Sequence, residues 1–144
     1  MRHLTLAFLL AACLCGCGVE NAITDPELLA GRAFWEPNHS GVRMFAGKAY
    51  FDGPGVIYQQ VNFTQTGEYR ISMDVVGQSG DPWFWFFGDI PGAVGPVPNG
   101  THSHDFSMPI LGPRLIGVGV SIHNRAAKGV IDAVRIERLG DLKP

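Results

Sequence analysis

Cysteine is absent from the chain after residue 17, and this absence limits what can hold the fold together. The 144-residue sequence has three cysteines, Cys13, Cys15 and Cys17, all close to the N-terminus. Everything that follows is therefore held by an apolar core without disulfides. A domain of roughly 110 to 120 residues can supply such a core, and the hydrophobic content of 46% is sufficient for it.

The chain also lacks a charge excess of either sign. Eleven Lys and Arg residues face thirteen Asp and Glu residues, which gives a net charge of −2. Nucleic-acid binding depends on concentrated positive charge, so we expect no nucleic-acid partner. After the N-terminal segment no apolar run approaches the roughly 20 residues of a membrane span.

Motifs of common catalytic sites are missing as well. The sequence has no Gly-x-Ser-x-Gly, no His-Glu-x-x-His and no phosphate-binding loop. Four carboxylates, Glu68, Asp74, Asp81 and Asp89, have the chemistry of a glycosidase pair about 5 to 9 Å apart, but the sequence does not bring them together. We expect a protein that is not an enzyme, with a small hydrolase as the alternative.

The N-terminus has the pattern of a targeting segment. Arg2 precedes an uncharged apolar run from Leu4 to Ala12. The residues around the cysteines then resemble the lipobox of bacterial lipoproteins, in two registers. Leu10-Ala11-Ala12-Cys13 matches the motif best, whereas Leu14-Cys15-Gly16-Cys17 leaves a leader of better length, and we favour Cys17 over Cys13 as the lipidated residue. A plain secretory signal is the alternative.

This interpretation divides the chain into three parts. Residues 1–17 are expected to be a lipoprotein signal peptide, 18–31 a tether with a short helical turn, and 32–140 the folded domain. Thr24 or Asp25 can cap the turn, Pro26 suits its first position and Gly31 can end it. The lipid would be the only membrane contact and would hold the domain at the bacterial cell envelope, on the outer membrane or cell surface.

Short apolar-polar alternations separated by turn residues follow. The composition, with Gly 19 and Pro 10, favours many turns over long helices. A long loop over 89–103 is a candidate binding loop. We predict an all-β fold, an antiparallel jelly-roll β-sandwich of eight or nine strands after a short N-terminal helical turn. The expected strands are 32–36, 42–45, 48–51, 56–63, 68–76, 82–88, 104–108, 114–124 and 130–139.

Three of these segments resemble a known family. Gly-Val-Ile-Tyr-Gln-Gln-Val over 55–61, Thr-Gly-Glu-Tyr-Arg-Ile-Ser over 66–72 and Gly-Val-Ile-Asp-Ala-Val-Arg-Ile over 129–136 are similar to the hairpin and end strand of galactose-binding-like β-sandwiches. This superfamily includes the jelly-roll carbohydrate-binding modules. The resemblance implies a jelly-roll sandwich and a carbohydrate partner.

An unusual aromatic strand lies in the middle of the chain, Trp-Phe-Trp-Phe-Phe over 83–87. Alternation places Trp83, Trp85 and Phe87 on one face and Phe84 and Phe86 on the other. If the tryptophan face is exposed, two indoles about 7 Å apart form a platform for saccharide rings. If it is buried, the tryptophans belong to the core.

Polar side chains are needed beside such a platform to bind sugar hydroxyls. The predicted strand faces offer several of them, while glycines at 117 and 119 would leave the sheet open. The expected ligand-binding set is Trp83, Trp85, Tyr58, Gln60, Arg70, Asp74 and His123.

Asp132 is a candidate metal ligand. It shares its parity with Val134 and Ile136 and is expected to point inward, where a carboxylate needs a partner or an ion. The family resemblance implies a structural calcium ion here, with Asp25 or Glu27 as a second ligand. Hydrogen bonds to turn amides or an ion pair with Arg32 are the alternatives.

Two histidines, His102 and His104, are separated by one residue and therefore share a strand face. Such a pair can chelate a transition metal, although no second ligand cluster is visible in the sequence. We interpret them as polar loop residues.

The sequence thus favours a non-catalytic, surface-anchored binding module that recognises carbohydrate through its aromatic strand. The alternative is a structural or protein-interaction lipoprotein whose partner is an envelope protein. The side of the aromatic strand that faces solvent separates the two.

Overall fold

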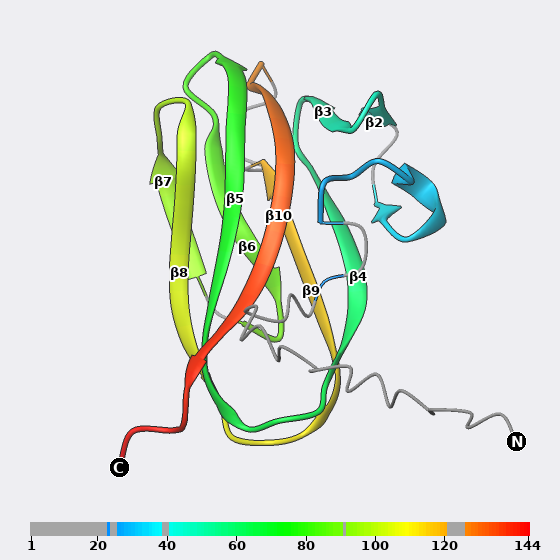
Figure 1. Ribbon diagram of the computed structural model, residues 1–144. Helices are drawn as coiled ribbons and strands as arrows, with labels where there is room; N and C mark the ends of the chain where they lie inside the picture. Colours follow the sequence, from blue (N-terminus) through cyan, green and yellow to red (C-terminus); the bar gives the residue numbers. More distant parts are fainter. Residues whose placement is uncertain (1–22, 24–25, 39–40, 91, 121–125) are drawn as a thin grey trace, which may run out of the picture.

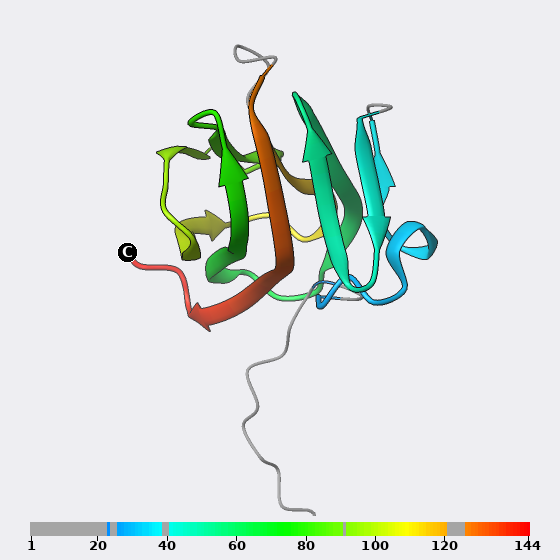
Figure 2. The same ribbon diagram turned by 90° about the horizontal axis from the view of Figure 1, so that it is seen from above.

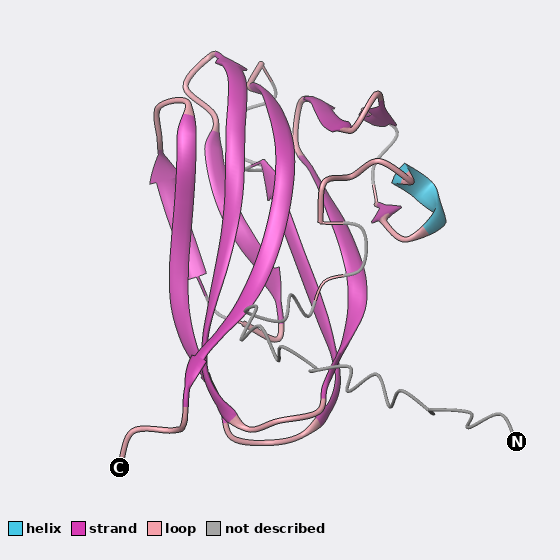
Figure 3. Ribbon diagram, viewed as in Figure 1, coloured by secondary structure: helices cyan, strands magenta, loops and turns pink. Residues whose placement is uncertain are grey.

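The computed structural model describes residues 23, 26–38, 41–90, 92–120 and 126–144. Almost all regular structure in this part is β-strand, and one short 3₁₀ turn, η1 (Gly31–Ala33), precedes the strands (Figure 3). The strands are β1 (Glu36–Pro37), β2 (Val42–Phe45), β3 (Lys48–Asp52), β4 (Gly55–Phe63), β5 (Gly67–Ser79), β6 (Trp83–Gly88), β7 (Gly92–Pro96), β8 (Gly100–Met108), β9 (Gly112–Val120) and β10 (Lys128–Gly140).

The strands form two antiparallel sheets that pack face to face (Figures 1 and 2). One sheet has the order β1-β4-β9-β6-β7 and the other the order β2-β3-β10-β5-β8. Two pairs of consecutive described strands, β2–β3 and β6–β7, lie in the same sheet. At each of the remaining connections between described strands the chain crosses to the other sheet. The predicted all-β jelly-roll sandwich is confirmed.

Alternating side chains build the core between the sheets. In β9, Ile116 and Val118 are fully buried, as are Phe84 in β6 and Ile57 in β4. Each lies beside a residue of opposite parity that faces outward, which is the pattern expected of a strand with one face on the core. The sandwich is therefore held by two apolar inner faces, and its outer faces are available for function.

Three predicted segments differ from the structure. The predicted strand over 32–36 begins in a 3₁₀ turn, and of its residues only Glu36 belongs to a strand. The helical turn is found at Gly31–Ala33, after the predicted turn rather than within it, and it has no side-chain cap. The predicted loop over 89–103 contains β7 and the start of β8. β7 is an edge strand, where proline and glycine are tolerated because half of the backbone groups need no partner.

None of the helical structure in the described residues has the length and apolarity required to cross a membrane. The proposed signal peptide, with Cys13 and Cys17, lies outside the described residues.

Candidate functional site

The outward face of β6 carries exposed aromatic rings. Trp83 is 53% exposed, and Trp85 and Phe87 are partly exposed, whereas Phe84 and Phe86 on the opposite face are buried. The strand thus fills the core with its phenylalanines at 84 and 86 and presents both indoles on the outside of the sheet. The two tryptophans do not belong to the core.

The aromatic surface continues across the sheet. Gly117 of β9 pairs with Phe87 on one side and with Tyr58 of β4 on the other. The Tyr58 and Phe87 ring centroids lie 6.3 Å apart across this glycine, with the rings tilted by 51°. Phe87 in turn meets Trp85 edge to face, with centroids 5.5 Å apart. We call the surface formed by Tyr58, Phe87, Trp85 and Trp83 the aromatic platform.

Glycines in β9 leave room for these rings. A Cβ atom added at Gly117 would lie 2.9 Å from the Cβ of Tyr58, and one added at Gly119 would lie 2.5 Å from a methyl carbon of Val56. Side chains at these two positions would stand between β4 and β6 and separate their rings. The spacing Gly-x-Gly in the sequence therefore serves a close approach between strands.

Polar groups accompany the platform. Gln60 is exposed on β4, two residues from Tyr58 and on the same face. Glu36 of β1 lies opposite Tyr58, and the hydrogen bond that the Tyr58 hydroxyl donates to its carboxylate raises the pKa of Tyr58 above the usual value. The sequence alone gives no indication that Glu36 belongs here, because a two-residue strand carries no periodic signal that would assign it a partner.

The indole Nε1–H of Trp85 has no hydrogen-bond acceptor among the described residues, although this atom is removed from solvent. A buried donor without an acceptor is unfavourable by about 1 to 3 kcal/mol. Groups of this kind in native structures are rare and often have a functional reason.

Two of the predicted ligand-binding residues are not brought to the platform, and a third lies outside the described residues. Arg70 and Asp74 lie on β5, on the outward face of the other sheet, so the prediction that they join the tryptophans is wrong. Alternation gave their parity correctly but does not reveal which sheet a strand enters. His123 lies outside the described residues.

Arg70 and Asp74 instead have structural partners. Arg70 forms a two-pronged ion pair with Asp105 on the neighbouring strand, at 2.7 and 2.8 Å, and this hydrogen bonding lowers the pKa of Asp105. Asp74 accepts hydrogen bonds from Thr101 at 2.6 Å and from Arg135 at 2.8 Å. These residues join β5 to β8 and β10.

The proposed calcium ligands do not converge in the described residues. Asp132 does not point inward: its side chain is 41% exposed and accepts a hydrogen bond from Lys48 at 2.7 Å. Irregular pairing on both sides of Ile131 shifts the alternation of β10 at this point, so the expected parity does not hold.

Glu27 is bound to Arg135 at 2.7 Å, and Asp25 lies outside the described residues. Each of the two described carboxylates is paired with a cation, and the described residues do not show them sharing a ligand site. A calcium ion that uses Asp25 stays a prediction.

His102 and His104 share a strand face, as predicted, but they lie in β8 and not in a loop, and each ring has a protein partner. The His102 ring nitrogen Nε2 lies 2.8 Å from the carbonyl oxygen of Pro98, and His104 stacks on Phe86 with centroids 6.2 Å apart. Among the described residues there is no group of three or more His, Cys, Asp or Glu side chains that could hold a metal ion.

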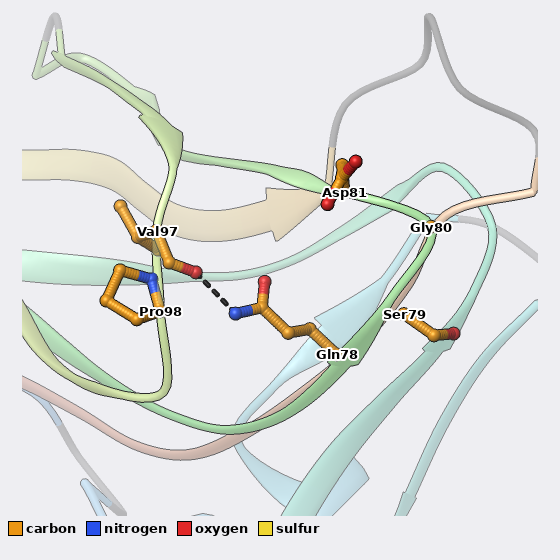
Figure 4. A pocket seen from close by; sticks show the side chains of 6 residues that line it. All are labelled: Gln78, Ser79, Gly80, Asp81, Val97 and Pro98. Atoms are coloured by element: carbon orange, nitrogen blue, oxygen red, sulfur yellow. Dashed lines mark hydrogen bonds between the residues drawn. The ribbon is translucent and has the colours of Figure 1, made fainter.

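A surface pocket of 330 Å³ lies where the loops before β6 and before β8 meet (Figure 4). Gln78 spans it and donates a hydrogen bond to the carbonyl oxygen of Val97 at 2.6 Å. The pocket is lined by Gln78, Ser79, Gly80, Asp81, Val97 and Pro98. None of these residues belongs to the predicted site.

Comparison with known proteins places the fold. No family model matches the sequence, and no curated protein matches it. Among solved structures the chain is similar to TmCBM61 in complex with β-1,4-galactotriose, with a TM-score of 0.62, 15% identity and coverage of 83% of this chain and 99% of that one.

It is also similar to the mannan-binding module from Man5C, with a TM-score of 0.57, 16% identity and coverage of 75% of this chain and 95% of that one. A third similar structure is a carbohydrate-binding module from Cellvibrio mixtus lichenase 5A in complex with cellotriose. Its TM-score is 0.51 at 18% identity, with coverage of 69% of this chain and 88% of that one. The protein has the β-sandwich fold of carbohydrate-binding modules.

Proposed function

We propose that this protein is a non-catalytic carbohydrate-binding module that holds a saccharide chain on the aromatic platform. The observation that carries the proposal is the exposure of Trp83 beside the partly exposed Trp85 and Phe87 on one strand face. Large apolar rings that remain open to water on a sheet face are favourable sites for the apolar faces of a ligand. The structural neighbours, which are carbohydrate-binding modules, support this assignment.

The geometry of the rings favours an individual chain over the surface of a crystalline polysaccharide. Trp85 and Phe87 are inclined by 84° to one another, and Tyr58 and Phe87 by 51°. A flat crystalline face requires coplanar rings, whereas a chain that twists from one sugar to the next can use rings at different angles. Gln60 and the Glu36–Tyr58 pair offer hydrogen bonds to its hydroxyl groups.

Binding to soluble polysaccharides tests the proposal, with Trp83→Ala and Trp85→Ala as the variants. The matched control is Phe45→Ala, because Phe45 is 55% exposed but lies on the outward face of the other sheet. We expect each tryptophan variant to lose about 2 kcal/mol of binding free energy, about a 30-fold loss of affinity, and the control to bind normally. Equal effects of all three substitutions, or retained binding without both indoles, would contradict the proposal.

We further propose that the module is anchored to the cell envelope by a lipid on Cys17. The apolar run and the lipobox-like residues before this cysteine support this. Labelling of the expressed full chain with a tagged fatty acid should be lost in Cys17→Ala and retained in Cys13→Ala. Label that is lost only in Cys13→Ala would move the anchor to that residue, and no label in the unmodified chain would refute the lipid.

A further inference from the structure

The two outward faces of the sandwich differ sharply in charge. Around the aromatic platform the described outward side chains of β4 and β9 are uncharged; they are Val56, Tyr58, Gln60, Asn62, Pro113 and Leu115. Residues 91–98, which contain the neighbouring edge strand β7, include no ionisable residue in the sequence.

Among the described residues, the charges that lie near the platform are carboxylates. Glu36 lies opposite Tyr58 on the neighbouring strand, and Asp89, directly after β6, accepts a hydrogen bond from the backbone N–H of Leu115 at 2.9 Å. Asp81 is exposed two residues before Trp83. β9 contains one cation, Arg114. It has the opposite parity to the platform residues, and its guanidinium donates hydrogen bonds to the carbonyl oxygens of Pro113 and Ile110. Among the described residues, the platform therefore has carboxylates at its margin and no Lys or Arg on its surface.

The outward face of the other sheet, in contrast, carries many charged side chains. Its cations are paired with carboxylates on neighbouring strands, which leaves them engaged within the protein. The pairs are Arg43–Asp52, Lys48–Asp132, Arg70–Asp105 and Arg135–Asp74.

This distribution bears on the class of saccharide that the platform can hold. Uronate or sulfate groups are recognised by Arg and Lys, Arg in a two-pronged geometry. An acidic glycan laid along β6 would meet rings and carboxylates instead, and like charges at short range are unfavourable. Hydroxyl groups of a neutral sugar can donate to those carboxylates and to the Gln60 carbonyl oxygen, while the sugar's C–H faces contact the rings.

We propose that the aromatic platform is selective for uncharged glycan chains, an inference that rests on the proposed carbohydrate-binding function. The selectivity has two physical sources: the absence of cations from the described platform, and the margin formed by Glu36, Asp81 and Asp89. Binding should consequently be insensitive to salt, because it uses no ion pair with the ligand.

Affinity electrophoresis of the full chain tests this with matched polymers. The probes are soluble galactan, glucomannan and hydroxyethyl cellulose, the same three polymers after oxidation of their primary alcohols to carboxylates, and chitosan as a cationic chain. We expect retention by at least one neutral polymer, at least about tenfold weaker retention by its oxidised form, and no preference for chitosan. Retention by the neutral form should be equal at about 20 mM and about 500 mM salt.

The outcomes separate this inference from the proposed function. Retention by the oxidised polymers or by chitosan that equals or exceeds retention by the neutral ones, and that Trp85→Ala abolishes, would overturn the selectivity and leave the binding function intact. No retention by any of the seven probes would overturn both. Weakened binding of the oxidised polymer should be partly relieved in the Glu36→Gln variant, and unchanged discrimination there would remove Glu36 from the explanation.

Discussion

Replacing Gly117 by alanine tests the close approach of strands on which the platform depends. The added Cβ would lie 2.9 Å from the Cβ and 3.1 Å from the Cα of Tyr58, and closer still to the carbonyl oxygen of Ile57. Real Cβ atoms essentially never lie closer than 3 Å to such atoms, and two of the three neighbours belong to the backbone of β4. The strand must therefore shift.

Overpacking of this kind is unfavourable by about 1 to 3 kcal/mol. With a urea dependence of about 1 to 3 kcal/mol per molar for a small domain, we expect the urea midpoint of Gly117→Ala to fall by roughly 1 M, with an unchanged slope. Tyr58 should also move relative to Phe87, from which its ring lies 6.3 Å away, so saccharide affinity should fall in the folded variant.

Gly140→Ala is the control, because a Cβ there meets nothing within 4 Å. It should be neutral, or more stable by up to about 1 kcal/mol through a less flexible unfolded chain. The reasoning is refuted if Gly117→Ala unfolds at the same urea concentration as the unmodified protein, since β4 and β9 would then tolerate a side chain between their aromatic residues.

Three further predictions concern the sandwich itself. Burial alone would raise the pKa of Asp74, but hydrogen bonds from Thr101 and Arg135 hold it below the usual value. Its contribution to stability is present above the unfolded-state pKa of about 4 and is lost as the pH falls through the lower folded-state pKa, so Asp74→Asn should flatten the acid side of a plot of Tm against pH. Phe84→Ala should lower the free energy of unfolding by about 3 to 5 kcal/mol, because this side chain is fully buried, as denaturant titration can measure. If the Lys48–Asp132 ion pair stands in place of a bound ion, removal of divalent cations with EDTA should leave the Tm unchanged, whereas a fall in Tm would support the calcium ion that uses Asp25.

Local alternation was sufficient to predict the parts of the site that belong to single strands. The opposite orientation of Trp85 and Phe86, and of Gly117 and Val118, follows from a period of two residues and is found in the structure. Which of the two faces meets the core does not follow from the pattern, because both faces of 83–87 are aromatic. The sheet order decides it: β9 and β7 flank β6, and the other sheet covers Phe84 and Phe86.

Sequence reasoning failed where position depends on partners distant in the chain. Arg70 and Asp74 have the predicted outward parity but lie in the other sheet, because the chain crosses between sheets after β4. Asp132 does not have the predicted inward parity, because the pairing of β10 is irregular at this point. β7 was predicted as a loop because it is rich in glycine and proline, which an edge strand tolerates. In each case the missing information concerns strand pairing, which local propensity does not contain.

The indole of Trp85 connects stability with function in this fold. Its Nε1–H has no acceptor among the described residues, and this is unfavourable for the free protein by about 1 to 3 kcal/mol. A phenylalanine would keep an aromatic ring at this position of the strand without that donor. A saccharide hydroxyl that reaches the indole would accept this hydrogen bond only in the complex. The free-energy cost of the unpaired donor in the free protein would then be relieved on binding and would add to the binding free energy. Trp85→Phe should accordingly leave the domain at least as stable and still weaken its affinity for glycan, a combination that a purely structural role of this residue does not produce.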